Sequence, residues 1–213
     1  MGWKAACILV STREPGYLGT LPQHDPQAAR ELIDRLALGP YSSCGLTDFD
    51  YGIFPESGRL VIGAYDGAAI VAERNLIYGT VTGENAWILQ TLLALFPDAE
   101  LLVIELHSVV NYFAYAYYRH GKLRRAYAGD AEHGVVVDIG ELQPEESEYF
   151  AHSEVRDGVR YFNMDGETWT VDQVGENLVF AMASKFFGRT LDEFAIEELT
   201  VEEFERTSLS TRG

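Results

Sequence analysis

A β-hairpin pattern within residues 101–138 constrains the fold of this chain more than any other feature. Two strand-like runs flank the sequence Arg119–Lys122, and its central pair, His120-Gly121, suits a two-residue turn that needs positive φ. Upstream, Glu105 and His107 are expected on one face of a strand, because side chains in a strand repeat every two residues. The stretch therefore predicts an antiparallel sheet.

Further local signals extend this sheet. The segment Trp3–Ser11 has apolar residues on both faces of the expected strand, which predicts a buried first strand. Asp66-Gly67 and Asp165-Gly166 are turn pairs between strand-like runs, so they predict two more hairpins. Residues 41–58 show no clear period and are expected to be irregular. Hairpins at this frequency argue against a doubly wound parallel sheet.

Helix signals are fewer. Asp25-Pro26 predicts one helix start, residues 82–84 a second, and the capping box Thr170–Gln173 a third. A further capping box, Thr200–Glu203, predicts a short terminal helix. The sequence thus indicates a single α+β domain over residues 1–207, with a mainly antiparallel sheet, about three main helices packed on it, and a polar tail over 208–213.

Composition narrows the class of protein. The chain has 213 residues, of which 47% are hydrophobic, so it can bury a sizeable core. It has no run of about 18 apolar residues, and the apolar stretch at 5–10 is too short for a signal peptide. We therefore expect no membrane span and a cytoplasmic location of bacterial type. Cys7 and Cys44 form no CxxC pattern, so we expect neither a cysteine zinc site nor a disulfide framework.

Charge is the strongest global signal. The chain carries 33 acidic and 16 basic side chains, a net charge of −17, and residues 141–206 hold 17 of the acids with only five bases. Phosphate binding needs the opposite sign, so nucleic acid is disfavoured as a partner. Two interpretations stay open: charge that only keeps the protein soluble, and an acidic face that attracts a basic protein partner. A homo-oligomer is a third possibility.

Glu105, His107, Ser108 and Asp138 are the candidate catalytic residues. A carboxylate beside His107 would tune the imidazole near neutral pH, although a structural histidine bonded to a carboxylate fits the pattern equally. Ser108 is expected on the opposite face of a regular strand, and no GxSxG elbow presents it. Asn111, Arg119 and Arg124 are the candidate ligand-binding residues. Arginine offers a planar fork of donors to an anion, but the basic cluster at 119–125 can also pair internally.

No cofactor or metal signature is found. His107, His120 and His133 lack metal-ligand spacing, and the sequence contains no GxxxxGK[ST] or GxGxxG loop. We therefore expect neither a metal nor a cofactor. The acid pairs Glu145-Glu146 and Glu202-Glu203 are interpreted as solvated surface residues.

Two segments, MGWKAACILV and LHSVVNYFAYAYYRHGKLRRAYAGDAEHGVVVDIGELQPEE, resemble an uncharacterised bacterial family, a domain of unknown function. The resemblance is best over residues 100–150 and poor over 155–213. It implies no activity, but it marks His107, Ser108, Asn111 and Asp138 as residues to test.

Two hypotheses for function follow. The first is a non-enzymatic acidic binding domain, immunity- or antitoxin-like, that engages a basic protein through its acidic C-terminal third, with Tyr149, Phe150 and Tyr161 exposed at the rim. The alternative is an enzyme or small-ligand-binding protein, which predicts a pocket at His107 where at least three of Glu105, Asn111, Arg119 and Asp138 converge.

Overall fold

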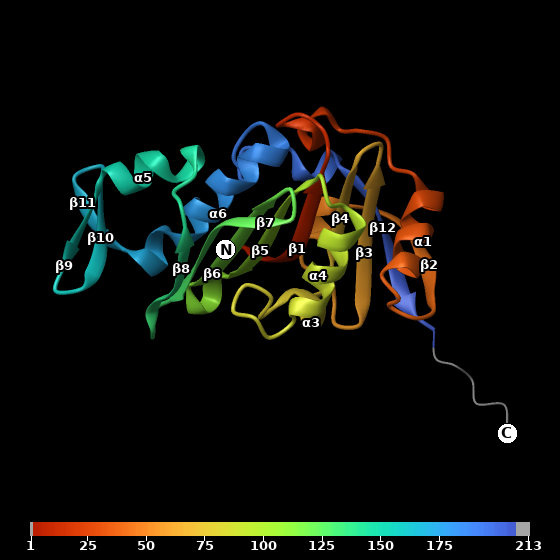
Figure 1. The fold of residues 1–213 in the computed structure, drawn as a ribbon, viewed down its shortest axis with the longest axis horizontal. Coiled ribbons are helices and arrows are strands. Elements are labelled where there is room, and N and C mark those ends of the chain that lie inside the picture. The colour runs from red at the N-terminus through yellow and green to blue at the C-terminus, as the bar shows by residue number, and fades with distance from the viewer. Residues whose placement is uncertain (1, 208–213) are drawn as a thin grey trace, which may run out of the picture.

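The computed structural model describes residues 2–207 and confirms an α+β fold built on one large antiparallel sheet (Figure 1). Nine strands of the described chain form it in the order β2-β12-β3-β4-β1-β5-β6-β7-β8. Their bounds are β1 (Lys4–Ser11), β2 (Tyr41–Asp48), β3 (Arg59–Tyr65), β4 (Ala68–Ala72), β5 (Glu100–His107), β6 (Tyr112–Arg119), β7 (Lys122–Asp130), β8 (Gly134–Gly140) and β12 (Thr200–Arg206). Each neighbouring pair is antiparallel.

The predicted hairpins are confirmed. Asp66-Gly67 joins β3 to β4, and His120-Gly121 joins β6 to β7. His120 and Gly121 have φ values of 50° and 69°, the positive pair that a two-residue turn with right-handed strand twist requires. Asp165 and Gly166 repeat this geometry in a smaller sheet. The turn residues therefore set the strand order locally.

Helices cover both faces of the large sheet. On one face α1, α3 and α4 pack over Ile8, Ile62 and Val103, and on the other face α2 and α6 pack over Cys7, Val61 and Ile104. The helices are α1 (Pro26–Arg35), α2 (Phe49–Gly52), α3 (Arg74–Ile77), α4 (Ala86–Leu95), α5 (Ser147–Ala151) and α6 (Val171–Phe187), with 3-10 turns at Tyr17–Thr20, Ser108–Val110, Pro144–Glu146 and Ile196–Glu198. Figure 1 shows α4 in front of the sheet and α6 behind it.

Capping residues start two of the main helices as predicted. The Asp25 carboxylate accepts hydrogen bonds from the backbone N–H groups of Gln27 (2.9 Å) and Ala28 (3.1 Å), and Pro26 takes the first helical position. The side chain of Gln173 accepts the backbone N–H of Thr170 at 2.9 Å, which completes the capping box of α6.

Two local expectations were wrong. Thr200–Glu203 does not begin a helix; it begins β12, which pairs with β2 on one side and β3 on the other. Residues 41–58 are not irregular throughout, since they contain β2 and α2. In both cases pairing between segments far apart in sequence outweighs the local pattern.

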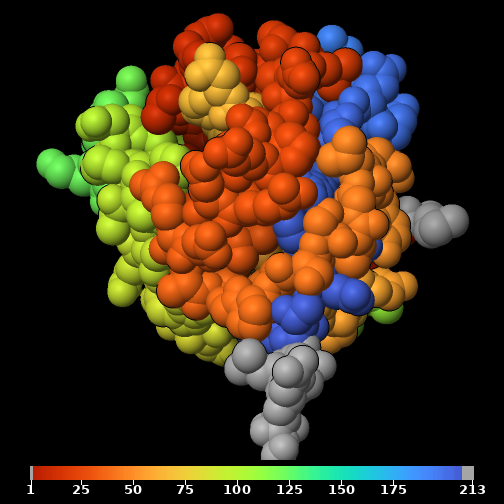
Figure 2. Space-filling model, turned by 90° about the vertical axis from the view of Figure 1, so that its right-hand side faces the viewer, coloured from red at the N-terminus to blue at the C-terminus, as the bar shows by residue number. Residues whose placement is uncertain are grey.

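Figure 2 views the sheet from its β2 end, where the late part of the chain, in blue, lies between early segments in red and orange.

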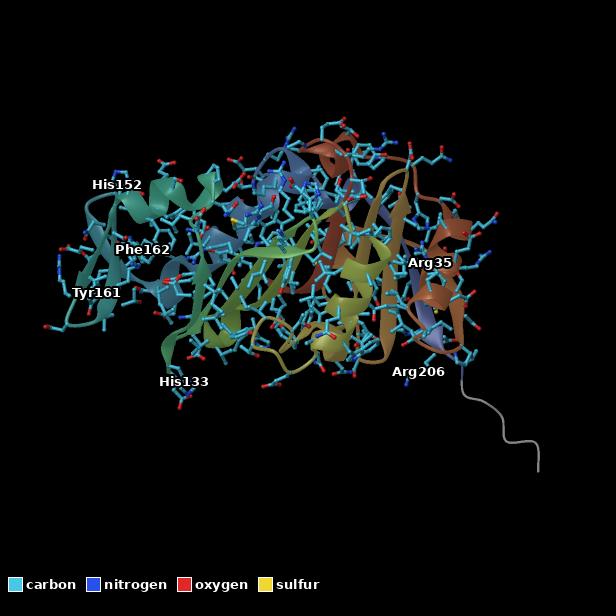
Figure 3. All side chains as sticks on the ribbon, in the orientation of Figure 1. Arg35, His133, His152, Tyr161, Phe162 and Arg206 are labelled. Atoms are coloured by element: carbon cyan, nitrogen blue, oxygen red, sulfur yellow. The ribbon has the colours of Figure 1, made fainter. Side chains whose placement is uncertain are left out.

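A small sheet in the order β11-β10-β9 extends beyond this body. Its strands are β9 (Ser153–Arg156), β10 (Val159–Met164) and β11 (Glu167–Thr170). Phe162 of β10 is fully buried, and its ring packs edge-on against Phe150 at a centroid distance of 5.6 Å. Phe150 in turn contacts Tyr127 of the large sheet. This aromatic chain attaches the small sheet to the main core. Figure 3 labels Phe162 in the small sheet.

Both outer strands of the large sheet contain a β-bulge. In β2, Ser43 and Gly45 face consecutive residues of β12, so Cys44 is the extra residue. In β8, Val135 and Val137 face consecutive residues of β7, so Val136 is the extra residue. A bulge twists an edge and disrupts its ladder, which hinders pairing with another chain.

Within the described range, no helix is both long enough and apolar enough to cross a membrane. The predicted polar tail at 208–213 lies outside the described residues.

Candidate functional site

Glu105 lies on β5 with its side chain fully buried under the loop that follows α3. Its carboxylate accepts the backbone N–H groups of Gly79 and Val81, both at 3.0 Å, and the hydroxyl of Tyr112 at 2.7 Å. Burial raises the pKa of Glu105, and these hydrogen bonds oppose that shift. The carboxylate therefore anchors the loop to the sheet.

His107 follows two residues later on the same strand, as the alternation predicts. It is half-buried, and its Nδ1 atom is buried without a hydrogen-bond partner in the part of the chain that the structure describes. No hydrogen bond to Glu105 is found among the described residues. The two side chains are neighbours on the strand but do not form the expected bonded pair.

Ser108 and Asn111 lie at a different hollow, of about 240 Å³, beside the N-terminal turns of α6. The hydroxyl of Ser108 contacts the Glu176 carboxylate and the carbonyl oxygen of Trp3. The side-chain amide of Asn111 donates to Asp172 at 3.0 Å. His107 does not line this hollow, so the histidine base that activates a serine nucleophile is not at Ser108.

The two candidate ligand-binding arginines, Arg119 and Arg124, lie in different environments. Arg119 pairs with Glu100 at 3.4 Å, and Arg124 is exposed on β7. The adjacent Arg125, which the sequence placed only in the basic cluster, is buried. Its Nε atom donates to Glu146 at 2.9 Å and its Nη1 atom to Asp138. Asp138 thus pairs with an arginine on β7, two strands from the β5 strand that ends at His107.

The Arg125–Glu146 pair joins the turn Pro144–Glu146 to the sheet. Glu146 is fully buried, which corrects its interpretation as a solvated surface residue. The Arg125 guanidinium also lies 4.8 Å from the centroid of the Tyr127 ring. Removing one partner of a buried ion pair leaves an uncompensated charge and costs about 3–5 kcal/mol. The pair is therefore a structural tie.

A second buried group, which no sequence pattern predicts, lies at the α1 end of the sheet. His24 Nε2 is 3.5 Å from the carboxylate of Glu202, and the backbone N–H of Ala64 donates to His24 Nδ1 at 3.2 Å. Ser43 donates its hydroxyl to the same carboxylate, and Arg30 approaches it at 3.7 Å. Glu202 is only 2% exposed, so it too is wrongly interpreted as a surface residue.

This group differs from a nucleophilic triad. In a triad the histidine lies between the nucleophile and the acid, whereas here the carboxylate of Glu202 lies between Ser43 and His24. Burial lowers the pKa of His24, while Glu202 and Asp25 oppose that shift. Residues 24, 43 and 202 come from distant parts of the chain, so no local pattern could reveal them.

The candidate site residues therefore occupy separate places in the fold. Glu105 and His107 lie near the loop after α3, Ser108 and Asn111 lie beside α6, and Asp138 lies on β8. Among residues 2–207, no three His, Cys, Asp or Glu side chains are grouped to hold a metal ion. Cys7 is buried and Cys44 exposed, and both are free thiols. Tyr149, Phe150 and Tyr161 are half-buried rather than exposed.

Comparison with known proteins places the chain in a family. No curated protein and no solved structure matches it. A family model described as a family of unknown function, DUF6928, matches residues 5–204. This range includes nearly all of the strands of the large sheet and the helices that cover it. The chain belongs to DUF6928, a family of unknown function.

Proposed function

We propose that this chain is a non-enzymatic binding domain that recognises a basic protein through its acidic C-terminal third. The observation that carries the proposal is the exposure of its carboxylates. Of the 17 acidic residues between 141 and 206, only Glu146 and Glu202 are buried. The exposed ones are Glu141, Glu148, Glu154, Asp157, Asp165, Glu167, Asp192, Glu193, Glu197, Glu198 and Glu205.

Part of this charge lies in α5 and in the segment that follows α6. We define the acidic ridge as Glu148 of α5 together with Asp192, Glu193, Glu197 and Glu198, which follow α6. Burial raises the pKa of Tyr149, and the charges of Glu148 and Asp192 add to that rise, so both of these carboxylates lie near Tyr149. α5 and the end of α6 lie along the upper edge of the view in Figure 1.

Few basic residues compensate the negative charge of the ridge. Lys185 forms an ion pair with Glu145 at 2.9 Å, and Arg189 is the one basic residue between 186 and 198. Like charges that remain uncompensated create a field that attracts a basic surface and steers its approach. This supports recognition of a basic protein; the role that we propose is inhibitory or adaptor-like, of the immunity or antitoxin kind, in the cytoplasm of a bacterium.

The bulges at both sheet edges support contact through side chains rather than strand addition, because each interrupts the ladder that an added strand would extend. The alternative of an enzyme or small-ligand site at His107 has less support. It needs at least three of Glu105, Asn111, Arg119 and Asp138 at one pocket, and Asn111, Arg119 and Asp138 bond to three different partners.

The test is affinity capture from the native cells with three versions of the chain. The ridge variant carries Asp192→Asn, Glu193→Gln, Glu197→Gln and Glu198→Gln. The matched control carries Asp34→Asn, Asp50→Asn, Glu56→Gln and Glu132→Gln, which removes the same charge from exposed positions elsewhere.

We expect a stoichiometric basic protein on the unchanged chain and on the control, lost from the ridge variant. Raising salt from about 50 mM to about 300 mM should also release it, because the screening length shortens. Equal capture by the ridge variant, or no partner on the unchanged chain, would contradict the proposal.

A further inference from the structure

We infer that a crevice between α1 and the end of α4 binds a small ligand with a compact apolar body and one carboxylate group, and that Arg35 is its counter-ion. The crevice has a volume of about 200 Å³ and opens at the end of the sheet where β3 turns into β4. It lies apart from the acidic ridge, so this inference is independent of the proposed function.

The floor of the crevice results from a change in side-chain size along two strands. On the face beneath α1, β3 presents Leu60 and Ile62 and then Ala64, while β4 presents Val71 and then Ala69. The large side chains fill the space under the helix, and the alanines near the hairpin do not. An apolar cavity of about 150 Å³ is enough to bind benzene, so this one accommodates a single ring or a short branched chain.

The walls are apolar and the mouth is charged. Leu32 of α1, Val10 of β1 and Phe96 at the end of α4 surround the floor, and Glu31 and Arg35 stand at the opening. Figure 3 marks Arg35 on α1 at this end of the molecule. A pocket that is largely apolar with a few polar groups at one side is typical of small-molecule sites.

Arg35 is available to an anion. It lies four residues after Glu31, the spacing that favours a helical ion pair, yet no ion pair of Arg35 is found in the described part of the chain. Its guanidinium instead lies over the Phe96 ring at 5.7 Å, and Glu31 accepts a hydrogen bond from Gln27 at 2.9 Å. A guanidinium stacked on a ring keeps its edge donors free for a carboxylate.

The crevice is fixed before any ligand arrives. The backbone N–H of Asp25 donates to the carbonyl oxygen of Ala64 at 2.8 Å, and the N–H of Ala64 donates to His24 Nδ1. These two bonds attach the start of α1 directly to a floor residue. A preformed site loses less free energy to ordering when a ligand binds.

The experiment is an NMR titration of the amide spectrum with benzoate, benzamide and benzylamine, which share a ring and differ in charge. We expect saturable binding of benzoate at millimolar concentration, with shifts at residues 10–12, 28–35, 64–69 and 96. Benzamide should bind about tenfold more weakly, since a charge-assisted hydrogen bond is lost. Benzylamine should bind no better than benzamide.

Three variants separate the parts of the inference. Arg35→Gln is on the surface and should weaken benzoate about tenfold while leaving benzamide unchanged. Arg124→Gln, an exposed arginine on β7, is the matched control and should change neither. Ala69→Leu should fill the crevice and abolish both; the rest of its spectrum reports whether it folds, and Arg35→Gln decides the question if it does not.

The inference is overturned if no benzoate binding saturates, if benzamide binds as tightly as benzoate, or if Arg124→Gln weakens benzoate as much as Arg35→Gln does.

Discussion

At the scale of single residues, burial and one backbone amide both favour the neutral form of His24. The N–H of Ala64 points at Nδ1, so Nδ1 must accept and the ring proton of neutral histidine must be on Nε2, facing Glu202. Protonating Nδ1 would place two N–H groups against each other. Burial acts in the same direction, because it disfavours the charged imidazole and lowers the pKa of His24.

We therefore expect stability to fall as pH is lowered through the region below 6.5, the ordinary histidine pKa. There the unfolded chain takes up a proton at residue 24 before the folded protein does, so acid favours unfolding. Urea unfolding between about pH 7.5 and about pH 5 measures this slope, and His24→Gln should make it shallower. His152→Gln, at an exposed histidine, is the control; equal flattening by both would contradict the assignment.

The burial of two carboxylates, Glu146 and Glu202, is the feature that the sequence predicted least well. Glu146 and Glu202 each sit beside another acid in the sequence, which is the pattern of a solvated surface. Their partners, Arg125 and His24, lie 21 and 178 residues away in the chain. A buried carboxylate is defined by such a partner, and no local pattern contains that information.

At the scale of elements, the hairpins were predictable because their information is local. Turn pairs such as His120-Gly121 and the alternation beside them predict the position of two strands, although the register of β6 and β7 shifts by one residue between Tyr117 and Tyr118. β12 was not predictable in this way. Its capping-box sequence favours a helix locally, but the strand completes the sheet between β2 and β3, and only the folded chain brings those strands together.

Gly175 offers a test of how closely α6 packs on the sheet. A Cβ atom at this position would lie 2.0 Å from a ring carbon of Phe113 on β6. Alanine is a better helix former than glycine by about 1 kcal/mol, but forcing an atom into a packed core costs about 1–3 kcal/mol. We therefore expect Gly175→Ala to lower the free energy of unfolding.

Chemical denaturation measures that change. Asn177→Ala, at an exposed position of the same helix, is the control and should be neutral or slightly stabilising. A stabilised Gly175→Ala protein would show that the contact between α6 and Phe113 is looser than described.

At the scale of the whole molecule, the net charge of −17 acts against compactness. We expect the thermal midpoint to rise when NaCl is raised from about 10 mM to about 150 mM, because salt screens repulsion among exposed carboxylates. Calorimetry measures this rise. The ridge variant should show a smaller one than the unchanged chain, and an equal or larger rise would mean that the ridge is not a main source of the repulsion.

The position of β12 has a consequence for how the protein is made. β2 and β3 do not pair with each other; each takes β12, which begins at residue 200, as a neighbour, and β3 also pairs with β4 on its other side. During synthesis, the edge of β3 that carries Leu60 and Ile62 stays without this neighbour until residues 200–206 have emerged from the ribosome. β2 therefore joins the sheet only after residues 200–206 have been made, while the meander from β5 to β8 is free to form as it is made.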